Sequence, residues 1–248
     1  MVHLPVGYGM AIFDSIDSTN VEARRRAASA SDRTVYWAKR QTAGRGRRGR
    51  SWMSEPGNLF VSLLLKPGCP LAQAAQLSFV TALAVSDLLA KAGAGDRAAL
   101  KWPNDVLVDG AKICGILLEA TSTGARAEAV VVGIGLNLVS HPDGTPYPAT
   151  DFRHAGLPGI DIDQALTWLL AAFELRYAAW LDGGFGAVRA DWLVRAWRLG
   201  QEIQMRLDGE TVTGRFAELD ETGALVVETA KGERRHITAG DVYFHGAV

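Results

Sequence analysis

VLVDGAKICGILLEA, residues 106–120, is the stretch that decides the fold of this chain. Two apolar runs flank Asp109-Gly110, a dipeptide that favours the tight turn of a β-hairpin. Further strand-like runs precede and follow the hairpin, at residues 34–41, 59–66, 99–102 and 128–139. Neighbouring strands without long crossovers are typical of antiparallel pairing rather than of alternating βαβ units. We therefore predict an α+β protein built on a mixed, largely antiparallel sheet.

Helical patterns occur at four places and are expected to flank this sheet. The first helix begins with a T-x-x-E capping box near Ser18 or Thr19, and the second covers residues 71–92. The third starts at residues 161–163, and the fourth ends at Gly200. The sheet and these helices form the main domain, which we assign to residues 1–198.

After Gly200 the sequence changes to short strand-like runs divided by turn signals. Five such runs lie at residues 201–207, 211–219, 224–230, 234–238 and 241–245. So many short strands in one short segment predict a small β-barrel appended to the main domain. We assign this second domain to residues 199–248.

Bulk composition indicates an ordinary globular protein. The 248 residues are 48% hydrophobic and 21% charged, and the formal net charge is −1. A charge near zero gives no global attraction to nucleic acid or to an anionic membrane. The N-terminus lacks the pattern of a signal peptide, and no apolar run approaches the ~20 residues of a membrane span. We expect a cytoplasmic protein that binds neither DNA nor membranes.

Cysteine and histidine give no metal-binding signature. Cys69 and Cys114 are isolated, the five histidines are scattered, and neither C-x-x-C nor H-E-x-x-H occurs. Each cysteine is expected to be a small buried apolar residue. We predict no metal ion bound directly by side chains of this protein.

The segment GRGRRGRS, residues 44–51, carries the basic character of the chain. It matches parts of the dinucleotide fingerprint, the P-loop and the kinase glycine-rich loop. The first two need a helix after the loop, whereas Pro56-Gly57 and a strand-like run follow here, and the kinase partners H-R-D and D-F-G are absent. Its glycines let a ligand approach the backbone, and its arginines supply forked donors for carboxylate or phosphate. We predict a flexible loop that becomes ordered around an anionic ligand.

Three other short motifs accompany this arginine loop: DSTN at residues 17–20, KWPND at 101–105 and GIGLN at 133–137. They supply hydroxyls and an amide at a helix start, a lysine at a strand end, and a polar side chain after a closely packed strand. Read alone, DSTN favours simple helix capping, and KWPND favours a core tryptophan followed by an ordinary turn. Only their combination with the arginine loop indicates a binding site.

Taken together and in this order, the motifs resemble those of biotin protein ligases. The matching pieces are DSIDSTN, QTAGRGRRGRSW, KWPND, KICGILLE and VGIGLN, which cover most of residues 12–139. The resemblance implies the catalytic-domain fold of class II aminoacyl-tRNA synthetases and biotin ligases, with an SH3-like β-barrel at the C-terminus. Because the first motif arrives by residue 14, we expect the monofunctional form, without an N-terminal DNA-binding domain.

The resemblance also implies a two-step reaction that uses biotin and ATP. The biotin carboxylate attacks the α-phosphate of ATP to give biotinyl-5′-AMP, and a lysine of a biotin carboxyl carrier protein then takes the biotin. Because the first step joins two anions, we expect cations at the reacting groups, with Mg²⁺ held through the phosphates. Arg47 and Lys101 are the expected catalytic residues. The sequence leaves open whether the protein is a monomer or a homodimer.

By resemblance, two sets of residues contact the substrates. The biotin site is assigned to Ser18, Thr19, Asn20, Gln41, Arg45, Gly46, Arg47 and Lys101. The nucleotide site is assigned to Arg47, Trp52, Lys101, Lys112 and Asn137. Lys112 is equally compatible with an exposed lysine of the hairpin, and no residue of the C-terminal domain is assigned.

Two other functions are compatible with parts of the sequence. A lipoate or octanoate protein ligase would share the domain plan and the adenylation chemistry, but is not expected to combine GRGRRGR with KWPND. An RNA-binding module using residues 39–50 as a basic tether would need aromatic side chains among the arginines. Only Trp37 and Trp52 flank the loop. Of the three functions, a biotin ligase accounts for the most motifs.

Overall fold

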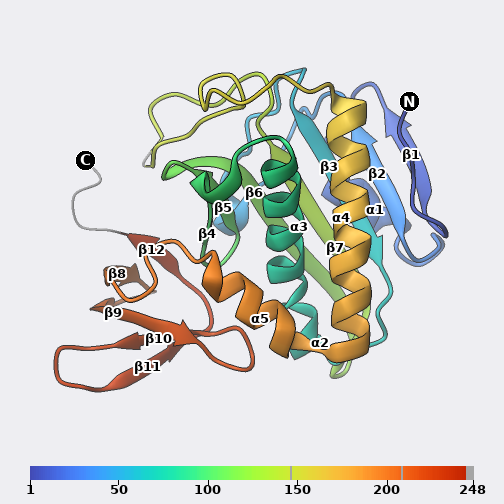
Figure 1. Ribbon diagram of the computed structural model, residues 1–248. Coiled ribbons are helices and arrows are strands. Elements are labelled where there is room, and N and C mark those ends of the chain that lie inside the picture. Colours follow the sequence, from blue (N-terminus) through green and yellow to red (C-terminus); the bar gives the residue numbers. More distant parts are fainter. Residues whose placement is uncertain (146, 208, 244–248) are drawn as a thin grey trace.

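A seven-stranded sheet forms the centre of the computed structural model, which describes residues 1–145, 147–207 and 209–243 (Figure 1). The strand order is β1-β2-β3-β7-β6-β5-β4. The strands are β1 (Gly9–Phe13), β2 (Thr34–Ala38), β3 (Leu59–Leu65), β4 (Ala98–Lys101), β5 (Asp105–Val108), β6 (Ala111–Thr123) and β7 (Arg126–Leu136). Only β1 and β2 pair in parallel, and the other neighbours are antiparallel. The prediction of a mixed, largely antiparallel sheet is confirmed.

The hairpin predicted at residues 106–120 is formed by β5 and β6. Asp109 and Gly110 form the turn between them, with φ values of 51° and 80°. Because glycine adopts such left-handed values without steric cost, it is favoured at position 110. β7 then pairs with β6 on one edge and with β3 on the other. The sequence did not indicate β1, a short apolar edge strand in which no residue is fully buried and apolar and polar residues do not alternate.

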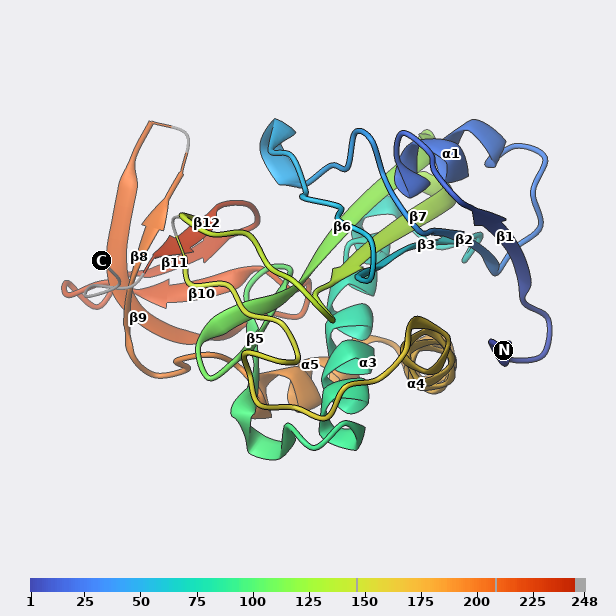
Figure 2. The same cartoon turned by 90° about the horizontal axis from the view of Figure 1, so that it is seen from above.

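Helices cover both faces of the large sheet (Figure 2). One face carries α1, and the other carries α3 and α4, which pack against each other. The helices are α1 (Thr19–Arg26), α2 (Leu71–Ala74), α3 (Leu77–Lys91), α4 (Ile162–Gly183) and α5 (Phe185–Val194), with 3₁₀ turns η1 (Arg47–Gly49) and η2 (Gly95–Arg97). All four predicted helical segments therefore contain helix, although the second is interrupted after residue 74.

Two details of the helices differ from the sequence analysis. The capping box at the start of α1 is not formed, because Ser18 makes no side-chain capping hydrogen bond and Glu22 pairs with Arg25 and Arg26 instead. The segment Leu71–Lys91 does qualify as a membrane span by length and hydropathy, contrary to expectation. However, 72% of its most apolar window is buried inside the protein, and α3, which makes up most of the segment, is a core helix.

All five strands predicted after Gly200 are present, and they form a second, antiparallel sheet. They are β8 (Glu202–Arg206), β9 (Thr211–Leu219), β10 (Leu225–Glu228), β11 (Arg234–Ile237) and β12 (Asp241–Tyr243). The order is β11-β10-β9-β8-β12, so within the described residues strand pairing does not close this sheet into a barrel. Figure 2 shows the second sheet beside the β5 end of the large sheet, remote from β1.

Aromatic side chains join the second sheet to the main body. Phe79 of α3 contacts Phe185 and Trp192 of α5, with ring centroids 5.3 and 5.5 Å apart, and Trp192 lies 6.5 Å from Phe216 of β9. The indole Nε1 of Trp102, after β4, donates to the carbonyl oxygen of Gly223 at 3.1 Å. The two sheets therefore share one continuous apolar core.

Candidate active site

A cavity of about 330 Å³ lies where the four sequence motifs meet. Its lining includes every residue assigned from sequence to biotin or nucleotide: Ser18, Thr19, Asn20, Gln41, Arg45, Gly46, Arg47, Trp52, Lys101, Lys112 and Asn137. These residues come from the start of α1, the loop after β2, and the ends of β4, β6 and β7. The fold brings them together as predicted, whereas their contacts with substrates stay predictions.

Polar side chains at the start of α1 are held by hydrogen bonds within the protein. The backbone N–H and the hydroxyl of Thr19 lie 2.9 and 3.1 Å from Oε1 of Gln41 and donate to it. Asn20 accepts from the buried Ser62 hydroxyl at 2.6 Å and donates through Nδ2 to Glu119 at 2.9 Å. These bonds fix the orientation of each amide before any ligand arrives. The result is a preorganised surface of donors and acceptors.

Trp52 lies directly on the sheet, where glycines of β6 and β7 leave room for its ring. A β-carbon at Gly115 would stand 2.7 Å from the indole, and one at Gly135 would collide with it. Gly133 makes the same allowance for Asn20. The ammonium group of Lys112 stands 5.3 Å from the centroid of the indole. The glycines of GIGLN therefore serve the close approach of cavity side chains.

The arginine loop lines the cavity and also contacts the second sheet. Arg47 donates through Nη1 to Oδ1 of Asn104 at 3.0 Å and through Nη2 to the carbonyl oxygen of Gly240 at 3.3 Å. Burial lowers the pKa of Arg47, although a guanidinium stays charged in proteins. Arg47, Arg48 and Arg50 lie 3.7, 3.8 and 3.2 Å from carboxylate oxygens of Asp241. Three arginines of the loop therefore gather around the single carboxylate of Asp241.

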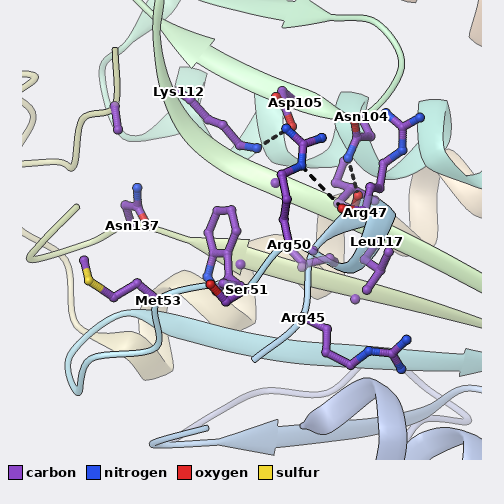
Figure 3. A pocket seen from close by; sticks show the side chains of 18 of the residues that line it. Arg45, Arg47, Arg50, Ser51, Met53, Asn104, Asp105, Lys112, Leu117 and Asn137 are labelled. Carbon is purple, nitrogen blue, oxygen red and sulfur yellow. Dashed lines mark hydrogen bonds and ion pairs between the residues drawn. The ribbon is translucent and has the colours of Figure 1, made fainter. Parts of the chain in front are cut away.

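Two lysines complete the cationic side of the cavity. Lys101, at the end of β4, is only 8% exposed, and its ammonium lies 3.6 Å from the ring centroid of Tyr147. Loss of hydration through burial lowers the pKa of Lys101 to about 8. Lys112 forms a 2.7 Å ion pair with Asp105, which Figure 3 shows pointing toward one another. Lys112 is thus a cavity residue and not an exposed hairpin lysine.

Arg45 and Asn137 line the cavity but also contact other parts of the protein. Arg45 points away from Arg47 and Arg50 in Figure 3 and stands 3.4 Å from a carboxylate oxygen of Glu119. Asn137 is buried and donates through Nδ2 to the carbonyl oxygen of Thr150 at 3.0 Å. Asn137 therefore anchors the segment that follows β7, in addition to lining the cavity.

Sequence reasoning missed several residues that complete the site. Asp241 and Val242 of β12 line the cavity, and Tyr147 covers Lys101 from the segment after β7. No motif surrounds these residues, since they approach the site only through the packing of distant segments. A signal existed for Asn104 and Asp105, which belong to KWPND and also line the cavity.

Comparisons with known proteins assign this chain and its fold to one class of ligases. Residues 11–137 match the model of the biotin/lipoate A/B protein ligase family, and the chain belongs to that family. Residues 199–245 match the biotin protein ligase C-terminal domain. Over 238 residues the chain is 43% identical to the biotin–[acetyl-CoA-carboxylase] ligase of Paracoccus denitrificans, which covers 93% of this chain and 98% of that protein.

Two further relatives extend the comparison. The bifunctional ligase/repressor BirA of Bacillus spizizenii is 34% identical over 240 residues, which are 94% of this chain and 74% of that protein. A structure of the biotin protein ligase of Aquifex aeolicus in complex with biotin and ATP has a TM-score of 0.80 and 29% identity. That alignment covers 95% of this chain and 97% of the other.

Proposed function

We propose that this protein is a biotin protein ligase, which forms biotinyl-5′-AMP from biotin and ATP and transfers biotin to a lysine of a biotin carboxyl carrier protein. The observation that carries the proposal is the meeting of Arg47, Lys101 and the Thr19–Gln41 pair around one cavity. A 43% identical relative named biotin–[acetyl-CoA-carboxylase] ligase and a similar structure that holds biotin and ATP support the choice of substrates.

The first step needs cations because a carboxylate must approach a phosphate. Arg47 and Lys101 are the proposed catalytic residues: both are largely buried, and a charge in a poorly hydrated site acts more strongly on a reacting group. The biotin carboxylate attacks the α-phosphorus, the phosphoanhydride bond breaks, and pyrophosphate leaves. An anion beside Lys101 raises its pKa again and keeps the ammonium protonated at neutral pH.

Biotin recognition is proposed for the preorganised side of the cavity. Its ureido ring offers N–H donors and a carbonyl acceptor, and Ser18, Thr19, Asn20 and Gln41 supply complementary groups. Gln41 is held by Thr19 and by Ser54, so its amide does not need to reorient when the ligand binds. We assign Arg45 and Gly46, also in the lining, to the same ligand.

ATP is proposed to lie between the lysines and the Trp52 ring, with Asn137 alongside. Asp105 and Asp241 are the carboxylates among the described lining residues, and both are ion-paired with cations. A Mg²⁺ ion would therefore be held mainly by the phosphates of ATP. Asp105 is the side chain whose carboxylate suits Mg²⁺ as a further ligand. When bound, Mg²⁺ neutralises charge on the leaving pyrophosphate.

The second step is the attack of a lysine amine on the mixed anhydride, with AMP as the leaving group. The arginine loop covers the cavity, so it is suited to keep water from the intermediate until the carrier protein arrives. We propose that the chain acts in the cytoplasm and divides into residues 1–198 and 199–248. The second unit is proposed to be an SH3-like barrel whose Asp241 holds the loop.

ATP–pyrophosphate exchange with biotin, with lipoate and with neither acid tests the proposal. We expect isotope exchange with biotin alone, and abolition of exchange by Lys101→Gln. Exchange with lipoate but not biotin would assign the chain to the other branch of its family. Absence of exchange with both acids, together with salt-dependent binding of single-stranded RNA, would favour a nucleic-acid function.

A further inference from the structure

His141 and His154, which belong to none of the cavity motifs, both contact the buried carboxylate of Asp151. Asp151 is fully buried, and its Oδ2 atom lies 2.8 Å from Nδ1 of His141 and 2.9 Å from Nδ1 of His154. The backbone N–H of His154 donates to Oδ1 at 2.9 Å. The two imidazole rings are 4.7 Å apart and nearly perpendicular. Both Nδ1 atoms therefore lie against Oδ2, and Nδ1 of His154 also stands 3.0 Å from Oδ1.

The carboxylate of Asp151 needs a positive charge beside it. A carboxyl group that accepts three N–H bonds is held in the ionised form, and an ionised group out of water is costly without a cation. Among the ion pairs of the described residues, Asp151 is matched only with His141 and His154, and with no lysine or arginine.

We propose that His141, Asp151 and His154 form a binding site for a divalent transition cation of the zinc type. Two imidazole nitrogens and one carboxylate oxygen are a donor set that such ions favour. The candidate donor atoms already lie within 4.8 Å of one another. Ligand atoms around a tetrahedral zinc ion stand about 3.3 Å apart, so shifts of roughly half an ångström separate the Nδ1 and Oδ2 atoms to coordination distance.

The accessibility of the cluster fits an ion that enters from solvent. The side chain of His154 is 62% exposed, that of His141 is 17% exposed, and Asp151 lies beneath them. A three-ligand site open on one side keeps a position for water. Each imidazole would bind through Nδ1 and carry its proton on Nε2, which is the tautomer opposite to the one that now bonds to Asp151.

The position of the site connects it to the cavity. His141 and Asp151 bracket the segment that supplies Tyr147 and Ala149 to the cavity lining. The carbonyl oxygen of Thr150, beside Asp151, accepts from Asn137. A cation bound to both His141 and Asp151 would hold these two positions together and restrain Tyr147 and Ala149 in the wall of the cavity.

Calorimetric titration of ZnCl₂ into the full-length protein, freed of metal with EDTA and without biotin or ATP, tests the site. We expect one Zn²⁺ per chain at micromolar affinity. His141→Gln and His154→Gln should each weaken binding at least tenfold. The matched control is His236→Gln, since His236 forms a similar surface pair with Asp220 and should leave binding unchanged. Co²⁺ in place of zinc should give the visible absorption of a low-coordinate site in the parent protein only.

The side chain of His154 is exposed, so the fold tolerates its substitution. Asp151 is fully buried, and for this reason the test uses the histidine variants rather than Asp151→Asn. Failure to bind stoichiometric Zn²⁺, or equal affinity in the parent and in both histidine variants, would overturn the proposal. Because no substrate is present, neither result bears on the ligase activity.

Discussion

At the scale of single residues, Lys101 carries an electrostatic conflict that suits its proposed role. The fold buries its ammonium to 8% exposure and thereby lowers its pKa from 10.5 to about 8. The charged form is disfavoured in the folded protein until an anion arrives. Burial of Lys101 therefore lowers the stability of the folded protein, and it leaves a poorly hydrated cation that interacts strongly with a carboxylate or phosphate.

Lys101→Met should stabilise the protein while it removes activity. Below pH 8 the lysine is charged in both the folded and the unfolded chain, so its full penalty, about 3 kcal/mol for the shift, opposes folding. The penalty fades as pH rises from 8 to 10.5. Urea unfolding should therefore show a large gain for Lys101→Met at pH 7 and a small one at pH 10. The exposed Lys39→Met is the control, and a loss of stability at pH 7 would contradict this account.

Removal of the Arg47 side chain should affect both the adenylation reaction and the retention of its product. Arg47→Ala should lower the rate of biotin-dependent exchange by about a hundredfold, the scale of one well-placed donor of roughly 3 kcal/mol. It should also release biotinyl-5′-AMP faster, because the loop loses its bond to Asn104. Equal dissociation rates of the intermediate from variant and parent would refute the second effect. Arg40→Ala, exposed at the foot of the loop, is the control.

At the scale of elements, the arginine loop is a short hairpin held at both ends. Arg45 and Ser51 form an isolated bridge, and Gly46 N–H donates to the carbonyl oxygen of Arg50 at 2.7 Å. Its basic tip is tied to β12 through Asp241. These contacts give the loop a defined conformation, and its ordering on ligand binding stays a prediction.

Asp241→Asn should loosen this loop without unfolding the second sheet. Three arginines lose their charged partner, so we expect trypsin to cut within residues 44–51 several times faster in the ligand-free protein. Biotin with ATP should restore protection, because substrate anions replace the carboxylate. Glu210→Gln breaks an exposed pair in the same sheet and should not change the cutting rate. Unchanged cleavage in Asp241→Asn would show that the loop does not depend on β12.

Gly135 of β7 leaves the space on the sheet that the Trp52 ring occupies, and Gly135→Ala tests the role of that ring. The β-carbon of Gly135→Ala would collide with the indole and displace it from the cavity floor. We expect the KM for ATP to rise about tenfold, with the KM for biotin changed less. Gly159→Ala adds the same atom where nothing lies within 4 Å, and should leave both constants unchanged. An unaltered KM for ATP in Gly135→Ala would remove Trp52 from the nucleotide site.

At the scale of the whole molecule, the two sheets fold as one apolar unit. Trp192 of α5 is 1% exposed and touches aromatic rings from both sides of the junction. Trp192→Ala should lower the free energy of unfolding by about 3–5 kcal/mol, the usual effect of removing a buried aromatic side chain. Both sheets should melt in one transition in the parent protein. The exposed Val194→Ala serves as the control, and separate melting of the two sheets in the parent would contradict a shared core.

The sequence by itself determined the features that depend on local chemistry. Asp109-Gly110 specified its turn, because few residues adopt left-handed angles. The start of α4, predicted at residues 161–163, is confirmed: Asp161 caps the helix by accepting a hydrogen bond from the N–H of Gln164 at 2.7 Å. The motifs identified cavity residues such as Lys101 because each motif carries unusual chemistry in a few neighbouring positions.

Only the tertiary structure decided which distant residues meet. Asp241 reaches the arginine loop, and His154 reaches His141, through packing between segments that share no sequence pattern. The same long-range packing buries Lys101 and sets its pKa, and it pairs the unpatterned β1 with β2. Local preferences act over a few residues, whereas burial and charge pairing depend on the whole fold, and for that reason the sequence could not reveal them.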